Sequence, residues 1–345
     1  MSASLLCSPI LPDTTIDSRR HRLSYNNMTK MSTCVDNSRS QTTTNPLSYD
    51  SDRTQIFDNP DLYEYVSFDD DEDDEVWLKV REEAQWDVEQ EPILSSYYFS
   101  TILAHDSLES ALATHLATKL SNSTLPSDAL TGVFYGVFKD DPEIRKAIRA
   151  DLRAAKERDP ACISYVHCLL NFKGFQACQA HRVAHKLWSQ GRNVLALLIQ
   201  NRVSVVFAVD IHPGAKIGRG ILLDHATGVV IGETAVVGNN VSILHNVTLG
   251  GTGKSSGDRH PKIGDGVLVG AGTHVLGNVR VCEGAKIGAG SVVLKEVPER
   301  ATAVGNPARI LGGREKPIRL DKLSKLPGIT MDHTSFLSDW SDYVI

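Results

Sequence analysis

The chain has 345 residues with a formal net charge of −6, and 41% of its residues are hydrophobic and 23% charged. This composition is typical of a globular protein, and the negative balance argues against nucleic acid as the main partner, because phosphate binding needs a basic surface. No apolar run of about 18 residues occurs, so neither a transmembrane helix nor a membrane partner is expected. Six cysteines without a Cys-x-x-Cys pair favour reduced thiols in an intracellular protein.

The first segment, residues 1–75, is predicted to be a disordered extension, since it is rich in Ser, Thr and Asn and ends in an acidic run at residues 69–75. Like charges repel, so the acidic run is interpreted as a solvated linker. Three arginines in residues 19–22 suit an organellar transit peptide, whereas two aspartates in residues 13–17 do not. We therefore expect a cytoplasmic protein, with the plastid as the alternative compartment.

A helical domain is expected next, over residues 76–208. Pro142 follows two aspartates and precedes Glu143, which is a typical helix start. Ile144, Ile148 and Leu152 then recur at intervals of four, as one apolar stripe of a helix does. Two further helices are expected, at residues 175–188 and 194–207.

At about Asp210 the apolar period changes to six. Thirteen aliphatic anchors follow this period: Ile211, Ile217, Leu223, Ile231, Val237, Ile243, Leu249, Ile263, Val269, Val275, Val281, Ile287 and Val293. Small or β-branched residues, Thr227 among them, stand four positions after the anchors. Glycines often follow the anchors directly, where freedom at positive φ would suit tight corners: Gly218, Gly232, Gly238, Gly264, Gly270 and Gly288.

A fixed period of six indicates a solenoid, in which each repeat buries its apolar face on its neighbours. The predicted fold class is α+β, with an all-helical N-terminal domain followed by a left-handed parallel β-helix of hexapeptide repeats at residues 209–310 and a C-terminal tail at residues 311–345. Three hexads would close one triangular coil. Insertions interrupt the period between Leu223 and Ile231 and at residues 250–262, and such insertions often form the binding face.

Candidate chemistry lies beside the two insertions. His225 is third in its hexad and is expected to point outward, with His245 stacked about one coil away. An exposed histidine is a natural general base, and Asp210 could hold its tautomer. Arg259 and His260, in the larger insertion, offer donors for a substrate carboxylate.

At these residues the chain resembles the serine O-acetyltransferase family. The two most specific strings are Asp-His-Ala-Thr-Gly at residues 224–228 and Gly-Asp-Arg-His-Pro at residues 257–261. The resemblance covers about residues 76–309. Further matching strings are Asp159–Ala161, Lys173–Phe175, Gln200–Ser204, Val209–Pro213, Gly232–Ala235 and Val247–Lys254.

This resemblance implies an enzyme that transfers acetyl from acetyl-CoA to the L-serine hydroxyl, giving O-acetyl-L-serine for cysteine biosynthesis. His225 would take the hydroxyl proton, Asp210 would hydrogen-bond the imidazole, and the Gly251 N–H would face the oxyanion. Acetyl-CoA is then a co-substrate, with no permanently bound cofactor and no metal. Further contacts are implied for the serine ammonium, at Asp159 and Asp224, for its carboxylate, at Arg259 and His260, and for CoA, at Thr252, Ala271, Lys286 and Ala289.

Partners are also implied by the resemblance. The tail keeps several apolar residues and ends at Ile345, and family members insert such a terminus into O-acetylserine sulfhydrylase to form the cysteine synthase complex. The resemblance further implies a homo-oligomer, either a trimer of β-helices or a hexamer made through the helical domains.

Other functions remain open from the residues alone. The chain could be a weakly active regulatory subunit of the cysteine synthase complex. A γ-type carbonic anhydrase also uses this predicted fold, with zinc on three histidines such as His225, His245 and His260. His181 and His185 have the i, i+4 spacing of a zinc site, but without an intervening Glu we expect them to pack or to form hydrogen bonds.

Overall fold

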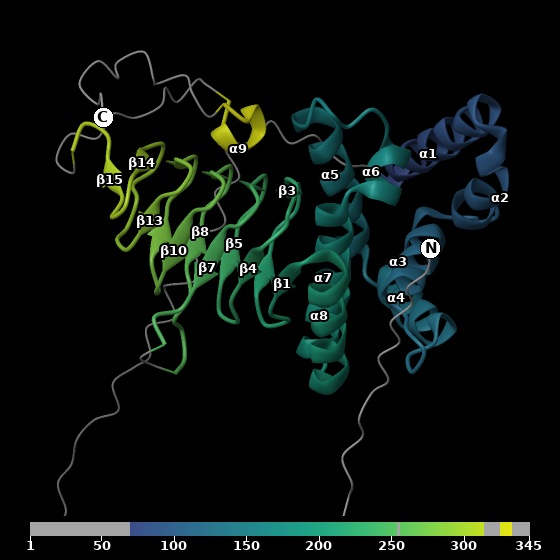
Figure 1. The fold of residues 1–345 in the computed structure, drawn as a ribbon, viewed down its shortest axis with the longest axis horizontal. Coiled ribbons are helices and arrows are strands. Elements are labelled where there is room, and N and C mark those ends of the chain that lie inside the picture. The colour runs from purple at the N-terminus through teal and green to yellow at the C-terminus, as the bar shows by residue number, and fades with distance from the viewer. Residues whose placement is uncertain (1–69, 254–255, 314–324, 333–345) are drawn as a thin grey trace, which may run out of the picture. The chain divides into compact units, whose positions relative to one another are not determined.

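Helices form the first part of the chain in the computed structural model, which describes residues 70–253, 256–313 and 325–332, with side chains from residue 75 (Figure 1). Within these ranges, no helix combines the length and the apolar character needed to cross a membrane. The helices that precede the sheets are α1 (Asp70–Gln90), η2 (Pro92–Leu94), α2 (Ser95–Tyr98), η3 (Phe99–Leu103), α3 (Leu108–Leu120), α4 (Ser127–Asp140), α5 (Pro142–Arg158), α6 (Tyr165–Asn171), α7 (Lys173–Ser189) and α8 (Asn193–Phe207).

Helix α5 begins where the sequence predicts. Asp141 caps it, because its carboxylate accepts the backbone N–H groups of Glu143 and Ile144, both at 3.1 Å. Ile148 and Leu152 are fully buried, so the predicted apolar stripe faces the core. The two further helices expected before the β-helix are also confirmed, as α7 and α8.

The acidic run differs from its prediction as a linker. The backbone is helical from Asp70, so residues 70–75 form the first turns of α1. Acidic residues are favourable there because the N-terminal end of a helix carries a partial positive charge. The predicted extension before Asp70 and the chain terminus with Ile345 lie outside the described residues.

A parallel β-helix follows α8, as predicted. Its strands form three sheets in the orders β1-β4-β7-β10-β13, β11-β8-β5-β2 and β15-β14-β12-β9-β6-β3. From β1 to β14 each strand pairs in parallel with the strand one coil further along, whereas β15 turns back and pairs antiparallel with β14. The strands are β1 (Val209–Ile211), β2 (Lys216–Ile217), β3 (Leu222–Leu223), β4 (Val229–Ile231), β5 (Val236–Val237), β6 (Ser242–Ile243), β7 (Thr248–Gly250), β8 (Lys262–Ile263), β9 (Leu268–Val269), β10 (His274–Leu276), β11 (Arg280–Val281), β12 (Lys286–Ile287), β13 (Val292–Val293), β14 (Thr302–Val304) and β15 (Arg309–Ile310).

The hexad anchors fill the interior of the coils. Each is buried except Ile217, which is partly buried against the same core. Thr227 corrects one detail of the prediction, since it is exposed and Ala226 is buried in its place. The two-residue insertion between Leu223 and Ile231 explains this, because it shifts the interior position at that corner.

The glycines that follow the anchors have a different role from the one predicted. Most residues of the coils with positive φ stand three positions after the anchors, where Gly272 has φ 68° and Asn246 has φ 55°. The glycines directly after the anchors instead allow close approach between coils. A Cβ on Gly270 would lie 2.5 Å from the backbone nitrogen of Ala289 on the next coil, and one on Gly264 would lie 2.7 Å from that of Glu283.

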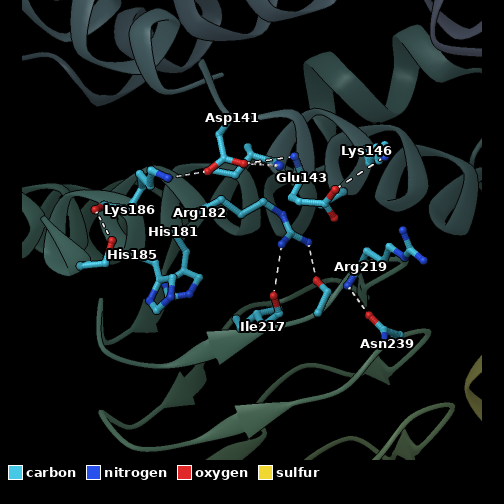
Figure 2. A pocket seen from close by; sticks show the side chains of 14 residues that line it. Asp141, Glu143, Lys146, His181, Arg182, His185, Lys186, Ile217, Arg219 and Asn239 are labelled. Atoms are coloured by element: carbon cyan, nitrogen blue, oxygen red, sulfur yellow. Dashed lines mark hydrogen bonds and ion pairs between the residues drawn. The ribbon is translucent and has the colours of Figure 1, made fainter. Parts of the chain in front are cut away.

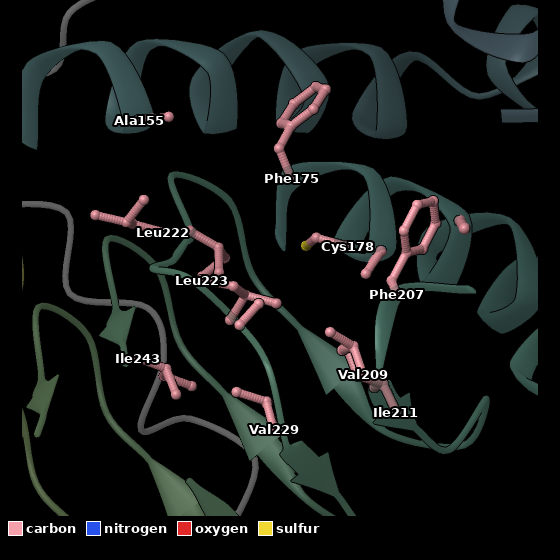
Figure 3. Packing of buried hydrophobic residues seen from close by; sticks show 14 of the residues in the cluster. Ala155, Phe175, Cys178, Phe207, Val209, Ile211, Leu222, Leu223, Val229 and Ile243 are labelled. Carbon is pink, nitrogen blue, oxygen red and sulfur yellow. The ribbon is translucent and has the colours of Figure 1, made fainter. Parts of the chain in front are cut away.

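The helices and the β-helix share one core. Figure 3 shows buried side chains of both parts in a single cluster, with Phe175 and Cys178 from α7 and Leu222 and Leu223 from β3. Near the C-terminus, the short helix α9 (Pro327–Thr330) contacts both α5 and β9. The first coils are therefore held against the helices, and this contact fixes the surroundings of the site.

Candidate active site

His225 lies in the turn between β3 and β4. Its side chain is 74% exposed, and its backbone φ is 53°, in the left-handed region. The ring lies 5.7 Å from that of His245, centre to centre, at an interplanar angle of 72°. The predicted outward direction of His225 and its stacking with His245 are therefore confirmed. An exposed imidazole of this kind is accessible to a substrate.

Two of the predicted CoA contacts lie in the same column as His225. We call this column the His225 corner; it consists of the turns at residues 224–228, 244–247, 270–273 and 288–291, which stack on successive coils. The backbone N–H that follows Ala271 donates to the His245 carbonyl (3.0 Å), and the N–H that follows Ala289 donates to the Ala271 carbonyl (2.8 Å). A ligand that extends along this corner would therefore meet His225 at one end and small side chains beyond it.

Asp210 lies at the centre of β1, where it is partly buried. Its Oδ1 accepts a hydrogen bond from Gln200 Nε2 of α8 at 2.6 Å. His225 Nε2 lies 3.8 Å from Oδ1 of its neighbour Asp224. Among the described residues, Asp210 and His225 share no hydrogen bond or ion pair, so the contact expected between them stays a prediction.

Arg259 and His260 lie at a different corner. We call it the loop corner; it consists of residues 212–215, 232–235, 251–253 and 256–261, which lie between the first and second strands of three successive coils. Arg259 Nη2 pairs with Glu233 Oε2 at 2.6 Å, and His260 Nδ1 lies 2.9 Å from Thr234 Oγ1. Burial lowers the pKa of His260, with smaller effects from Arg259 and Lys262, so its ring favours the neutral form.

The remaining predicted contacts are divided between these regions. Gly251 belongs to the loop corner, where a Cβ would lie 3.3 Å from His260 Nε2. Thr252 follows it, and a Cβ on Gly277 of the next coil would lie 3.1 Å from Thr252 Cγ2. Asp159 is the C-cap of α5 and accepts the Ala161 N–H at 2.8 Å. Within one chain, the structure therefore does not bring the predicted base and the predicted carboxylate ligands together.

Lys286 has surroundings that the sequence does not predict. Lys286 lies on β12 and is only 4% exposed. Burial lowers the pKa of its ammonium, and the charge of Asp332 opposes that change. A role for Lys286 in CoA binding stays a prediction, and it would require this side chain to move out of its buried position.

A cavity of about 810 Å³ opens elsewhere, between α5, α7 and β2, and Figure 2 shows the residues that line it. None of the predicted site residues lines this cavity. His181 is buried here, and His185 Nδ1 donates to the Pro213 carbonyl at 2.7 Å, which confirms packing and hydrogen bonding for this pair. In the described part of the chain, no group of three or more His, Cys, Asp or Glu side chains has the geometry to hold a metal ion.

Several residues at these corners were not assigned roles from the sequence. Glu233 and Thr234 hold the loop corner, Gln200 contacts Asp210, and Lys173 Nζ donates to Thr227 Oγ1 beside His225. Each belongs to a string that the sequence shares with the resembled family. The string was the available signal, but it does not say which partner each side chain has.

Comparison with known proteins identifies the class. A family model described as the serine acetyltransferase N-terminal domain matches residues 76–180, and one described as bacterial transferase hexapeptide (six repeats) matches residues 260–295. Together with the parallel β-helix, the second match places the chain among the hexapeptide-repeat transferases.

Its relatives identify one enzyme family within this class. The mitochondrial serine acetyltransferase 3 of Arabidopsis thaliana is 67% identical over 272 residues, which cover 79% of this chain and 69% of the relative. The chloroplastic serine acetyltransferase 1 of the same plant is 66% identical over 274 residues, covering 79% of this chain and 86% of the relative. The chain therefore belongs to the serine acetyltransferase family, whose members are acyltransferases.

Similar solved structures come from the same enzyme family. Soybean serine acetyltransferase complexed with serine is 65% identical with a TM-score of 0.69, covering 70% of this chain and all of that one. The Brucella abortus enzyme in complex with coenzyme A is 48% identical with a TM-score of 0.69, covering 72% of this chain and 99% of that one. A serine acetyltransferase in complex with cysteine is 49% identical with a TM-score of 0.71, covering 76% and 98% of the two chains.

Proposed function

We propose that this protein transfers the acetyl group of acetyl-CoA to the hydroxyl of L-serine, giving O-acetyl-L-serine for cysteine biosynthesis. The observation that carries the proposal is the His225 corner, where an exposed imidazole heads a column that continues through Ala271 and Ala289. Relatives with serine and with coenzyme A in their structures support both substrates. Acetyl-CoA acts as a co-substrate and not as a resident cofactor.

His225 is the proposed general base. It takes the proton of the serine hydroxyl as that oxygen attacks the thioester carbonyl, which forms a tetrahedral intermediate. The C–S bond then breaks, and the CoA sulfur leaves with the proton that the imidazolium returns. Asp210 would stabilise the imidazolium, as a carboxylate does when it is paired with a histidine that acts as general base. A serine hydroxyl is a poor nucleophile, so this proton transfer is the contribution that the reaction most needs.

The substrate contacts are proposed on the same basis. Asp159 and Asp224 would bind the serine ammonium, and Arg259 and His260 its carboxylate. The backbone N–H of Gly251 would face the oxyanion, because a glycine allows the main chain to approach the reacting carbonyl. Thr252, Ala271, Lys286 and Ala289 are the proposed CoA contacts.

A homo-oligomer would complete this site. His225 and Arg259 lie at different corners of one chain, so one serine can meet both only if a second copy supplies one of the two corners. Exposed apolar side chains on α8 and on β4, which pairs with the β1 strand that α8 contacts, support an interface there. Val194, Val205 and Val230 are 85%, 68% and 39% exposed. A cyclic trimer brings different surfaces of its subunits together in this way, and a hexamer of two trimers would keep the same sites.

The partner and the compartment remain proposals too. O-acetylserine sulfhydrylase would bind the C-terminal Ile345, so deletion of this residue should abolish co-migration with the sulfhydrylase and spare acetyl transfer. Unchanged co-migration would refute that contact. We propose the cytoplasm, with the plastid as alternative, and note that the two plant relatives are named as mitochondrial and chloroplastic. Imaging of the full chain as a fluorescent fusion would distinguish these compartments.

The function is tested by thiol release from acetyl-CoA, with L-serine, L-threonine and L-homoserine as acceptors at equal concentration. We expect release to depend on L-serine and O-acetyl-L-serine to accumulate in equal amount. Thiol release that ignores the acceptor would refute the proposal. Trace activity that appears only with the sulfhydrylase would favour a regulatory subunit, and one zinc per chain with CO₂ hydration would favour a carbonic anhydrase.

A further inference from the structure

The turn that carries His225 has an unfavourable backbone conformation. His225 and Ala226 have φ values of 53° and 56°, so two consecutive residues other than glycine lie in the left-handed region. A residue with a Cβ is disfavoured in this region and persists there only where its surroundings determine its conformation. Contacts outside the turn must therefore hold it, and these contacts decide where the imidazole lies.

The first turn of α7 supplies two of these contacts. Lys173 Nζ donates to Thr227 Oγ1, two residues after His225. Gly174 lies against the peptide of Leu223, two residues before His225. A Cβ on Gly174 would lie 3.0 Å from both the carbonyl carbon and the Cβ of Leu223, and closer still to the carbonyl oxygen. The beginning of α7 therefore holds both sides of the His225 turn, and its second residue must be glycine.

Helix α8 has the corresponding contact with the carboxylate. Gln200 Nε2 donates to Asp210 Oδ1 at 2.6 Å, and because a carboxylate has acceptors on both oxygens, Oδ2 keeps its capacity for another donor. The residue that joins α8 to β1, Ala208, accepts the Gly228 N–H at 2.8 Å. This hydrogen bond links the end of the His225 turn directly to the strand of Asp210.

We propose that α7 and α8 position the base and its carboxylate, with Lys173, Gly174 and Gln200 as positioning residues. The inference rests on the proposed function, because it concerns the roles given there to His225 and Asp210. It assigns a catalytic purpose to the packing of helices against the first coil. The three residues act through the two members of the pair, since the contacts described above are made with Thr227, Leu223 and Asp210 and not with the proposed substrate contacts.

The test compares Gln200→Leu and Lys173→Met with matched controls in the full-length oligomer. Gln190→Leu alters an exposed glutamine at the end of α7, and Lys216→Met alters an exposed lysine on β2. We expect the two positioning variants to lose about 10- to 100-fold in kcat, with the KM for L-serine and the melting temperature close to wild type. The controls should keep the wild-type kcat. Lys173→Arg should recover most of the loss, and Gly174→Ala should lower kcat further.

A His225→Ala background separates positioning from general damage to the structure. Once the base is absent, Gln200→Leu and Lys173→Met should lower the residual rate no further, because they act through the imidazole. Equal fold losses in both backgrounds, or a wild-type kcat in both variants, would overturn the inference while the proposed function stands. A wild-type protein that releases no thiol with L-serine would instead overturn the proposed function, and the inference with it.

Discussion

Arg182 Nη2 of α7 lies 2.6 Å from Asp151 Oδ2 of α5, and both side chains are almost fully buried. The pair also reaches the β-helix, because Asp151 accepts the Ile221 N–H at 2.8 Å and Arg182 donates to the Gly218 carbonyl at 2.7 Å. Figure 2 shows Arg182 extending from its helix toward the first coil. This pair thus joins two helices to the coil that carries His225.

Removing one partner of this pair should be strongly destabilising. Arg182→Met leaves the Asp151 carboxylate buried without its counter-ion, and such changes typically cost about 3–5 kcal/mol. Urea unfolding followed by circular dichroism measures the loss. Lys79→Met, which removes an exposed pair with Glu82, is the control and should change the unfolding free energy little. Equal effects of the two substitutions would contradict the account.

His115 should make the stability of the protein depend on pH. Burial, with a smaller effect of Lys119, lowers the pKa of His115 from 6.5 to about 4. The unfolded chain therefore takes up this proton at higher pH than the folded chain. The contribution of His115 to the free energy of unfolding is fully present above pH 6.5. It is lost as the pH falls toward 4, by up to about 3 kcal/mol.

The variant His115→Gln isolates this effect, because glutamine does not titrate and can still meet Gln176, which lies 3.2 Å from the imidazole. Urea unfolding at pH 7.5, 5.5 and 4.5 should show a smaller loss of stability on acidification in the variant than in the wild type. The same loss in both proteins would refute the assignment of the pH dependence to His115.

Two neighbouring glycines should respond differently to alanine. Gly270→Ala places a methyl group 2.5 Å from the Ala289 nitrogen, so the coils must separate locally. Gly272 has φ 68° and no atom nearer than 4.0 Å to the added Cβ, so Gly272→Ala should cost only on the order of 1 kcal/mol. Gly272→Asn should cost less stability than Gly272→Ala, because Asn240 and Asn246 occupy equivalent positions with positive φ. A larger loss of melting temperature in Gly272→Ala than in Gly270→Ala would contradict this explanation.

Mixed oligomers test whether the site is shared between chains. His225→Ala and Arg259→Ala should each inactivate a uniform oligomer, because one removes the proposed base and the other a proposed ligand of the serine carboxylate. In randomly mixed oligomers, about a quarter of the sites would combine an intact His225 corner with an intact loop corner. Thiol release should then recover on co-expression. If it stays as low as in the separate variants, both corners of a site come from one chain.

The six-residue period predicts the β-helix because it fixes which residue enters each coil, and Leu249 and Val275 are buried as the period requires. The same period misleads at Thr227, where two inserted residues shift the interior position. The sequence also does not show why each glycine near an anchor is needed. Close approach by the next coil and a positive φ both favour glycine. Gly264 serves the first purpose and Gly266, with φ 62°, the second.

The candidate site is predictable in its parts but not in its assembly. The outward direction of His225 follows from its place in the hexad, and so does its stacking on His245. The separation of His225 from Arg259 onto two corners depends on where the larger insertion leaves the coil. Gln200 and Asp210 show the same limit, because a helix and a strand meet there through tertiary packing that no local pattern describes.

The thiol release rate of His225→Ala with L-serine tests the central claim most directly, with His274→Ala, an exposed histidine on β10, as the matched control. Loss of the general base should lower kcat by about 10²- to 10⁴-fold while circular dichroism and oligomer size stay unchanged. His274→Ala should keep the wild-type rate. Near-wild-type turnover by a folded His225→Ala protein would show that another group accepts the serine proton.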